Sequence, residues 1–531
     1  MTAHSTIRRP GSLARSAGCT LILAWLLPVA ELSTQTPARP ISTRPATVQP
    51  AATALIRNAW VLDGRGTPAR RADVRVTGDR IAAIGALRPG PNETIIDAAG
   101  MTLAPGFIDT HSHHDRGLLD TTNVNARRAL AMVSQGVTTV VIGQDGGGSK
   151  LGALFERLDS QPVAVNVASY VGHGTIRRAV LGNDFKRHAT TAEIVRMQAL
   201  VRDEMRAGAL GLSTGLEYDP GIYSSPDEVL ALAKVAGDAG GRYISHIRSE
   251  DRDFWPALDE VITIGRVNHM PVQVSHIKLG MRDLWGHADS VVRVLNRARA
   301  VGVDITADVY PYLYWQSNLG VLYPKRNFTD SAETAFILTH LNTADDIIFN
   351  SVPGHPEYKG KTLAQVAAMR NLPAARTMMD LLALPGGPGA GIVAKGMDDA
   401  DVGILMQWPF TNICSDGMST GLHPRGFGSF AKVLGPYVRD RKLFPVEEAV
   451  RKMTSLAAHN VGLTERGVIA PGYFADLVLF DPATATDHAS FDTPQAPATG
   501  VRTVWVNGVV VFDGVASTGR FAGRALRRAV P

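Results

Sequence analysis

The middle of this chain alternates short apolar strands with amphipathic helices, and this alternation limits the available folds more than any other feature. Apolar residues recur at helical spacing over 191–207, 226–239, 287–300 and 446–459. Parallel strands need crossover helices of this kind, so the pattern predicts an α/β fold with a parallel sheet. The eight strand-like segments are GFIDTH, TTVVIG, PVAVNVA, ALGLSTG, RYISHI, PVQVSHI, VDITADV and TNICSD.

Eight strand–helix units make up a TIM-type (β/α)8 barrel, and we expect residues 105–465 to form one. Residues 313–400 follow the seventh strand and show little strand pattern. The functional loops of such barrels lie at the C-terminal ends of the strands. We therefore expect an insertion over 313–400 that covers this mouth as a lid.

The two flanks of the barrel segment share a different pattern, in which short alternating strands are separated by Gly, Asp and Pro turns. Examples are LIRNAWVLDG before the barrel and VRTVWVNGVVVFDG after it. Alternation with a period of two between turn residues is typical of strands with one buried face. We expect residues 52–104 and 466–531 to form the two parts of one small β-sandwich domain, the second part including a C-terminal tail.

The N-terminus has the composition of an export signal. A basic stretch precedes the apolar run from Cys19 to Ala30, and a polar, Pro-rich stretch follows it. The apolar run is shorter than the roughly 20 residues that a membrane-spanning helix needs. We expect a signal peptide over 1–33, a linker over 34–51, and an exported protein, periplasmic or secreted, without a stable membrane span.

The charge pattern indicates a small-molecule partner. The net charge is only +5, and the basic residues are scattered or lie at the two ends of the chain. A nucleic-acid-binding protein usually concentrates them on one face, so we expect no nucleic-acid partner. Self-association stays open. With Cys19 in the signal, Cys414 would have no disulfide partner.

Four histidines and one aspartate lie at the C-terminal ends of four predicted strands. His111 and His113 are two residues apart, so their side chains leave a strand on the same side. His246 and His276 end the fifth and sixth strands at matching positions, and Asp416 follows the eighth. Because these strand ends meet at one mouth, the pattern predicts a single metal site. Imidazole and carboxylate are zinc ligands, so we expect one or two Zn²⁺ ions.

The motif APGFIDTHSH, the two strand-end histidines and the SDG aspartate resemble the amidohydrolase superfamily in type and order. That superfamily also has a β-sandwich built from both chain ends. Finer motifs resemble one branch, the D-aminoacylases or N-acyl-D-amino-acid deacylases. These motifs are NVASYVGHGTIR, GALGLSTGLEYDPGIYSS, SHIRSE, SHIK, DVYPY, and SDG followed by HPRGFGSF.

The resemblance implies a metal-dependent enzyme that hydrolyses the linear amide of an N-acyl-D-amino acid to a carboxylic acid and a free amino acid. Asp416 would be the catalytic acid and base as well as a metal ligand. Tyr218, Lys278 and Arg425 fall where the family contacts the amide oxygen and carboxylate of the substrate. An arginine suits a bidentate carboxylate contact, and a lysine a point-charge contact.

The chain departs from the family at one expected ligand. Typical D-aminoacylases have a cysteine ligand after strand two, in a GNCG motif, whereas this chain has IGQDGGGS there. No lysine that could be carboxylated ends strand four, and Glu217 stands at that place. A carboxylate can bridge two metal ions, so we infer that Glu217 takes the bridging role, with Asp145 as the weaker alternative.

Two other functions stay open at this point. The first is a cyclic amidase or dipeptidase of the same superfamily, although many of these have the strand-four lysine that is missing here. The second is an exported metal-binding protein without catalysis. Asp416 argues against the second, because a site that only binds metal does not need a general base.

Overall fold

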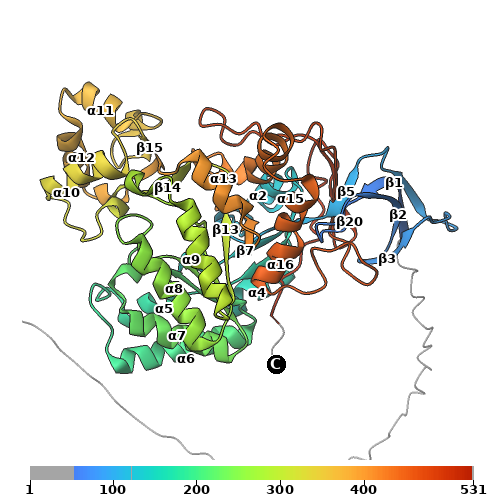
Figure 1. Ribbon diagram of the computed structural model, residues 1–531, viewed down its shortest axis with the longest axis horizontal. Helices are drawn as coiled ribbons and strands as arrows, with labels where there is room; N and C mark the ends of the chain where they lie inside the picture. The colour runs from blue at the N-terminus through green and yellow to red at the C-terminus, as the bar shows by residue number, and fades with distance from the viewer. Residues whose placement is uncertain (1–52, 121, 529–531) are drawn as a thin grey trace, which may run out of the picture. The chain divides into compact units, whose positions relative to one another are not determined.

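The computed structural model describes residues 53–120 and 122–528, and two sheets of parallel strands lie among the helices at their centre (Figure 1). One sheet has the order β6-β7-β8, and the other has the order β17-β13-β12-β11-β10-β9. The strands are β6 (Phe107–Asp109), β7 (Val137–Ile142), β8 (Asn166–Ser169), β9 (Val171–Gly172), β10 (Gly211–Gly215), β11 (Arg242–His246), β12 (Val272–Val274), β13 (Ile305–Val309) and β17 (Thr411–Ile413).

Backbone contacts join the two parallel sheets at both of their borders. β8 and β9 are separated only by Tyr170, whose N–H donates to the carbonyl of Ile142 at 3.1 Å. At the other border the Asp416 N–H donates to the His111 carbonyl at 2.8 Å, and Ser112 forms a parallel bridge with Gly417. The strands therefore form a closed ring, and the predicted TIM-type (β/α)8 barrel is confirmed.

The helices around the ring bury one apolar face each, as the sequence pattern predicts. In α6 this face is Met197, Val201 and Met205, and a capping box of Thr190 and Glu193 starts the helix. The expected helix over 446–459 is divided at Thr454. The barrel helices are α4 (Leu151–Ser160), α5 (His173–Leu181), α6 (Thr191–Ala207), α7 (Pro226–Asp238), α8 (Phe254–Asn268), α9 (Ala288–Ala300), α13 (Asp399–Gln407), α15 (Val446–Met453) and α16 (Ser455–Val461).

Shorter helices occupy the loops of the barrel. Four helices lie in the first and last of these loops: α1 (Asp115–Leu118), α2 (Val124–Arg127), α3 (Leu130–Val133) and α14 (Arg425–Lys432). The segment η7 (Val433–Asp440) continues α14 as a π-helix. Single turns form η1 (Gly221–Tyr223) and η2 (Arg282–Leu284).

One mixed sheet of eight strands is built from both ends of the described chain. The first group is β1 (Thr53–Val61), β2 (Arg70–Thr77), β3 (Arg80–Gly85), β4 (Thr94–Asp97) and β5 (Thr102–Pro105). The second is β18 (Leu477–Phe480), β19 (Val501–Val506) and β20 (Val509–Phe512). Antiparallel pairing of β5 with β18 joins the groups, and Val74, Leu103, Leu477 and Trp505 share one apolar core. Strands from both sides of the barrel segment therefore form one sheet.

The segment between β13 and β17 contains a folded unit with its own core, whereas we expected little strand structure there. Its sheet has the order β14-β16-β15. Its elements are β14 (Tyr314–Asn318), η3 (Leu319–Leu322), α10 (Ser331–Phe336), η4 (Ile337–Leu341), β15 (Ile347–Ser351), η5 (Pro356–Tyr358), α11 (Leu363–Arg370), α12 (Ala374–Leu382), η6 (Gly387–Gly389) and β16 (Gly391–Lys395). Leu319, Phe349, Met378 and Ile392 pack together inside it. We call this unit, residues 314–395, the insertion.

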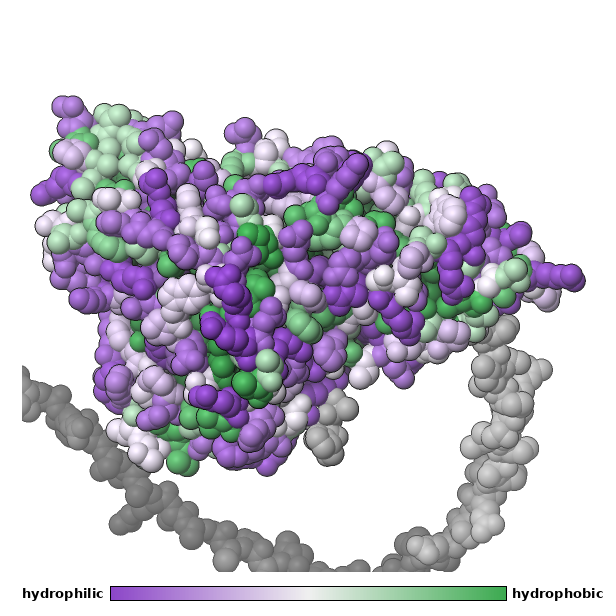
Figure 2. Space-filling model, viewed as in Figure 1, coloured by the Kyte–Doolittle hydropathy of each residue, from purple (hydrophilic) through white to green (hydrophobic). Residues whose placement is uncertain are grey.

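The surface has the mixed character of a globular enzyme. On the face drawn in Figure 2, hydrophilic and hydrophobic residues are interspersed over the barrel, the insertion and the β-domain. None of the helices in residues 53–120 and 122–528 is long and apolar enough to cross a membrane. The expected signal peptide and linker lie outside these residues.

Candidate metal centre and active site

The four histidines predicted as ligands meet at the C-terminal mouth of the barrel. His111 and His113 follow β6, His246 ends β11, and His276 lies two residues beyond β12. Ring centroids are 5.5 Å apart for His111 and His113, 4.7 Å for His111 and His276, and 4.8 Å for His246 and His276. His111 is 0% exposed and His276 is 1% exposed. The sequence therefore identified side chains that share one buried site.

Asp145 lies between these histidines. Its Oδ2 is 3.1 Å from His113 Nε2, and its Oδ1 is 3.4 Å from His111 Nε2 and 3.5 Å from His276 Nε2. The residue comes from the loop after β7, where the family resemblance implies a cysteine. One carboxylate thus contacts histidines from two different strands.

Asp416 completes the cluster from the loop after β17. Its Oδ1 is 3.3 Å from His113 Nε2 and 3.7 Å from His111 Nε2. Its Oδ2 is 2.6 Å from Nη1 of Arg425 at the start of α14. Ligand atoms of His111, Asp145, His276 and Asp416 all lie within 4.8 Å of one another, which suits a shared metal ion. Asp416 therefore contacts both the histidines and a buried cation.

Glu217, the residue that we expected to bridge two metals, lies at the side of the cluster. Its Oε2 is 2.8 Å from His246 Nε2, while Nδ1 of His246 is 3.1 Å from His276 Nε2. The ring of Tyr218 lies beside the ring of His246, with centroids 4.3 Å apart. The structure thus places Glu217 at the outer nitrogen of one histidine, and Asp145 at the place between the histidines.

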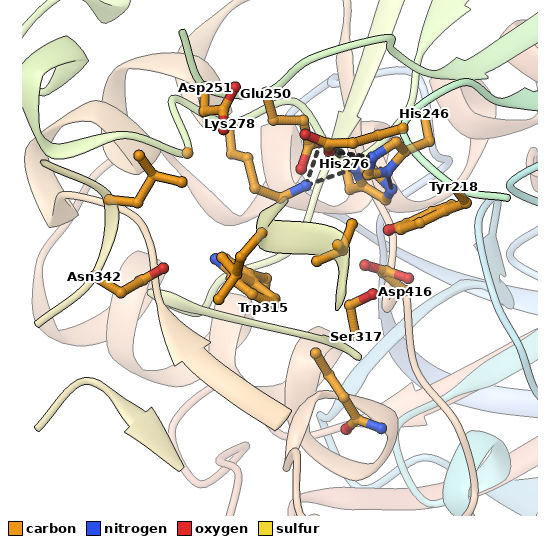
Figure 3. Close-up of a pocket in the computed structure, with 16 residues that line it drawn as sticks. Tyr218, His246, Glu250, Asp251, His276, Lys278, Trp315, Ser317, Asn342 and Asp416 are labelled. Carbon is orange, nitrogen blue, oxygen red and sulfur yellow. Dashed lines mark hydrogen bonds and ion pairs between the residues drawn. The ribbon is translucent and has the colours of Figure 1, made fainter. Parts of the chain in front are cut away.

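Lys278 is paired within the protein. Its ammonium is 2.6 Å from Glu250 Oε1 and 2.7 Å from His276 Nδ1, as the dashed lines in Figure 3 show. Glu250 Oε1 is 3.1 Å from the same ring nitrogen. His246, Glu250 and His276 form a second group with metal-ligand spacing, but a lysine cation already neutralises it.

Glu250 is a further member of this cluster that the sequence analysis did not single out. It lies four residues after His246 in the motif SHIRSE, so its proximity to a candidate ligand was visible. Its partner Lys278 follows the next strand, and nothing in the sequence indicated this pairing between two strand ends.

The backbone at the cluster adopts conformations that are rare for side-chain-bearing residues. Asp145, His276 and Asp416 have φ values of 53°, 33° and 47°. Such left-handed residues carry strain that surrounding contacts must offset, and they concentrate at functional sites. The Asp308 carboxylate accepts the N–H of His276, and the His111 carbonyl accepts that of Asp416. Neighbouring strands therefore hold these side chains in place.

The carboxylates and histidines strongly shift one another's pKa values. Burial alone would lower the pKa of His113, but Asp145 and Asp416 raise it to about 10. His276 rises to about 10 as well, because Glu250, Asp416 and Asp145 outweigh its burial and the charge of Lys278. Burial opposes ionisation of Asp145, yet the three histidines hold its pKa well below the usual value. The cluster therefore favours positive charge at its centre.

The donor atoms fit a metal ion. Nδ1 and Nε2 of His111 and Oδ1 of Asp145 are buried without a hydrogen-bond partner in the described protein. Buried polar atoms are normally satisfied, so the unpaired His111 Nε2 and Asp145 Oδ1, which lie 3.4 Å apart, indicate a ligand beside them. Imidazole nitrogens and carboxylate oxygens are donors that zinc accepts.

An open cleft of about 740 Å³ leads to the cluster. A narrower pocket adjoins it and shares Tyr218, Gln316, Ser317 and Asp416 with the cleft (Figure 3). Gln316 and Ser317 belong to β14 of the insertion, so the insertion lines the active-site mouth. Among the residues predicted to contact substrate, Tyr218 and Arg425 line the cleft and Lys278 lines the narrower pocket.

Comparison with known proteins agrees with this geometry. The model of the amidohydrolase family matches residues 94–310 and 390–512. Two proteins of Alcaligenes xylosoxydans xylosoxydans are similar over 89% of this chain. A D-aminoacylase is 37% identical over 97% of its length, and an N-acyl-D-glutamate deacylase is 36% identical over 96% of its length.

Solved structures extend the likeness. A D-aminoacylase crystal structure superposes with a TM-score of 0.80 and 36% identity, covering 90% of this chain and 99% of that one. An N-acyl-D-glutamate deacylase of Bordetella bronchiseptica, complexed with zinc and a phosphonate inhibitor, superposes with a TM-score of 0.79 and 35% identity. The match covers 90% of this chain and 100% of that one. The chain therefore belongs to the amidohydrolase superfamily and, within it, to the D-aminoacylase and N-acyl-D-amino-acid deacylase family.

Replacing His276 with Ala should remove bound metal and hydrolytic activity together, because its Nε2 faces the cluster from a buried position. Metal content by elemental mass spectrometry and folding by circular dichroism are the measurements. His269→Ala is the matched control, since His269 is exposed at the end of α8. A folded His276→Ala protein that kept its metal and its turnover would remove this residue from the site.

Proposed function

We propose that this protein hydrolyses the linear amide bond of N-acyl-D-amino acids, giving a carboxylic acid and a free D-amino acid. The observation that carries the proposal is the cluster of four histidines at the barrel mouth, where Asp416 contacts two of them and pairs with Arg425 beside an open cleft. The named relatives deacylate N-acyl-D-amino acids, and they cover nearly the whole folded chain.

One or two zinc ions would be held by the histidine cluster and Asp416, together with one further carboxylate. A related N-acyl-D-glutamate deacylase was crystallised with zinc. When bound, zinc polarises a scissile carbonyl and lowers the pKa of a bound water to about 7. The protein residues then supply proton transfer and substrate orientation.

Asp416 is the proposed general base and acid. Burial would raise the pKa of its carboxyl, but Arg425 and His276 outweigh burial and hold the pKa below the usual value. Its carboxylate is therefore ionised and able to accept a proton from the attacking water. The same group can return that proton to the leaving nitrogen, which makes the departing amine neutral.

Tyr218 and Arg425 are the proposed substrate contacts. Burial and the surrounding carboxylates raise the pKa of Tyr218 well above its usual value, so the hydroxyl stays protonated and can donate to the amide oxygen. Arg425 lines the cleft and suits a planar, bidentate contact with the substrate carboxylate. Lys278 and Arg425 are each paired with a carboxylate, but only Arg425 lines the open cleft, whereas Lys278 lines the narrower pocket; we therefore assign the substrate carboxylate to Arg425.

Linear amides are favoured over cyclic ones. D-hydantoinase shares only 16% identity with this chain at a TM-score of 0.54, so that likeness shows a common fold and nothing about substrate. Glu217 stands at the end of strand four, where the expected lysine of many cyclic amidases is absent. A panel of N-acetyl-D-amino acids, their L-enantiomers and a hydantoin tests the choice. Selective release of D-amino acid supports the proposal, and hydrolysis of the hydantoin alone contradicts it.

Asp416→Asn should lower turnover by about 10²–10⁴-fold, because the amide cannot take the proton while its shape is retained. Metal content should fall much less than turnover. Release of free amino acid under saturating substrate, with metal content measured on the same sample, gives the comparison. Turnover within tenfold of the unmodified protein would place the base elsewhere.

Arg425→Lys should mainly raise KM for substrates with a free carboxylate, since lysine loses the planar fork. The same change also weakens the contact with Asp416, so two substrates must be compared. An N-acyl amino acid amide has no free carboxylate, so its hydrolysis reports only the weakened contact with Asp416. Hydrolysis of the free acid reports that change together with the weakened contact to the substrate carboxylate. An equal loss on the two substrates would show that Arg425 acts only through Asp416.

We also propose that the protein is exported. The basic stretch and the apolar run from Cys19 to Ala30 support this, and both lie outside the described residues. Cell fractionation with N-terminal sequencing of the recovered protein is the test. An unprocessed chain found only in the cytoplasm would contradict export.

A further inference from the structure

We infer that Asp145 is the carboxylate that links the two histidine pairs of the metal centre, and that this centre uses only nitrogen and oxygen donors. Glu217 then acts as a positioning residue for His246. The inference rests on the proposed metal-dependent function, and it concerns which residues of this chain hold the ion and which ions they prefer.

The placement of the Asp145 oxygens carries the inference. One oxygen contacts His113, and the other contacts both His111 and His276. The carboxylate therefore contacts both histidines that follow β6, and the oxygen that contacts His111 also contacts the histidine that follows β12. A carboxylate has two donor oxygens. It could therefore bind two ions, one held by each histidine pair, or a single ion held between the two pairs.

Unpaired buried atoms give an independent indication of a ligand at this point. His111 is 0% exposed, and neither of its ring nitrogens has a hydrogen-bond partner among the described residues. Oδ1 of Asp145, the oxygen that faces His111, is also buried without a hydrogen bond. Polar atoms in such positions are costly unless a ligand satisfies them.

The loop that carries Asp145 is built around that side chain. A Cβ at Gly143 would lie 2.4 Å from the Tyr170 carbonyl oxygen, and one at Gly146 would lie 2.9 Å from the Gly215 nitrogen. Both glycines have positive φ, so larger residues are excluded on two grounds. Gln144 anchors the turn by donating to the Thr110 carbonyl at 2.8 Å. The turn thus holds Asp145 in a fixed, left-handed conformation.

Glu217 has the geometry of an outer partner. It contacts Nε2 of His246, which leaves Nδ1 of that ring facing the cluster. A histidine ligand commonly donates its other N–H to a carboxylate, which fixes the ring orientation and tautomer. On the neighbouring strand Glu250 also lies outside a histidine: it is 3.1 Å from Nδ1 of His276, beside Lys278, and Nε2 of that ring faces Asp145. Each of these two histidines therefore has its own outer carboxylate.

The donor set determines which ions fit. Cys414 is the only cysteine in the described part of the chain; its buried Sγ donates a hydrogen bond to Asp308 and is not among the grouped ligand atoms of the cluster. Without a thiolate, the centre should not favour soft ions such as Cd²⁺. Carboxylate oxygen suits Mn²⁺, and imidazole suits Zn²⁺, so both should be accepted.

The test places a thiolate at each carboxylate position in turn and loads the protein with Co²⁺. Asp145→Cys should develop a thiolate-to-cobalt charge-transfer absorption that the unmodified protein lacks, and its preference should shift from Mn²⁺ towards Cd²⁺. Glu217→Cys is the matched control and should develop no such band, because its side chain contacts His246 instead of the ion. Cobalt content and folding are measured on every sample.

Two conservative variants keep the test decisive if a cysteine variant fails to fold. Asp145→Asn should lose stoichiometric metal, whereas Glu217→Gln should keep the stoichiometry and weaken metal affinity by about 10- to 100-fold. A charge-transfer band in Glu217→Cys, or full metal content in Asp145→Asn, would overturn the assignment. These readouts need no substrate. A protein that binds metal through Asp145 but releases no D-amino acid would contradict the proposed function and leave the inference standing.

Discussion

The site depends on closure of the barrel between its first and last strands. The Asp416 N–H donates to the His111 carbonyl, and the Ser112–Gly417 bridge continues this pairing at the mouth. In β6 the Phe107 ring packs on the rings of Phe430 and Phe480, with centroid distances of 5.9 Å and 6.1 Å. Closing so long a segment costs chain entropy, and burial of these aromatic rings helps to offset it. The same pairing brings the proposed base to the histidines from β6.

Charge balance is the second requirement of this mouth. Several carboxylates are buried there, and a buried charge without a partner costs several kcal/mol. Arg425 is paired with Asp416, Lys278 with Glu250, and the histidines with Asp145. Arginine and lysine thus neutralise the carboxylates at the edges of the mouth. The centre instead contains histidines, which can lose a proton when a metal ion binds. The structural ion pairs therefore lie at the edges of the mouth, and the place for a metal ion lies between the histidines.

Much of the architecture could be predicted because it follows from local periodicity. The alternation of strands and helices predicted the barrel, and β5 pairs with β18 as the matching flanks suggested. The insertion was harder to predict, because its three strands pair in the order β14-β16-β15 across intervening helices. Residues that pair over such distances leave no short-range pattern. The interruption of α15 and α16 at Thr454 likewise follows from its φ of −133° and ψ of −90°, which no periodicity reveals.

The sequence by itself determined which side chains would stand at the strand ends, since a strand of known direction presents alternate residues to the same face. It therefore identified His111, His113, His246, His276 and Asp416. Only the tertiary structure decided which of two loop carboxylates lies between the histidines. Glu217 and Asp145 both follow strands, but the direction of a loop side chain depends on its backbone dihedrals and neighbouring contacts. The left-handed turn at Asp145 directs it inward, whereas Glu217 reaches only the outer nitrogen of His246.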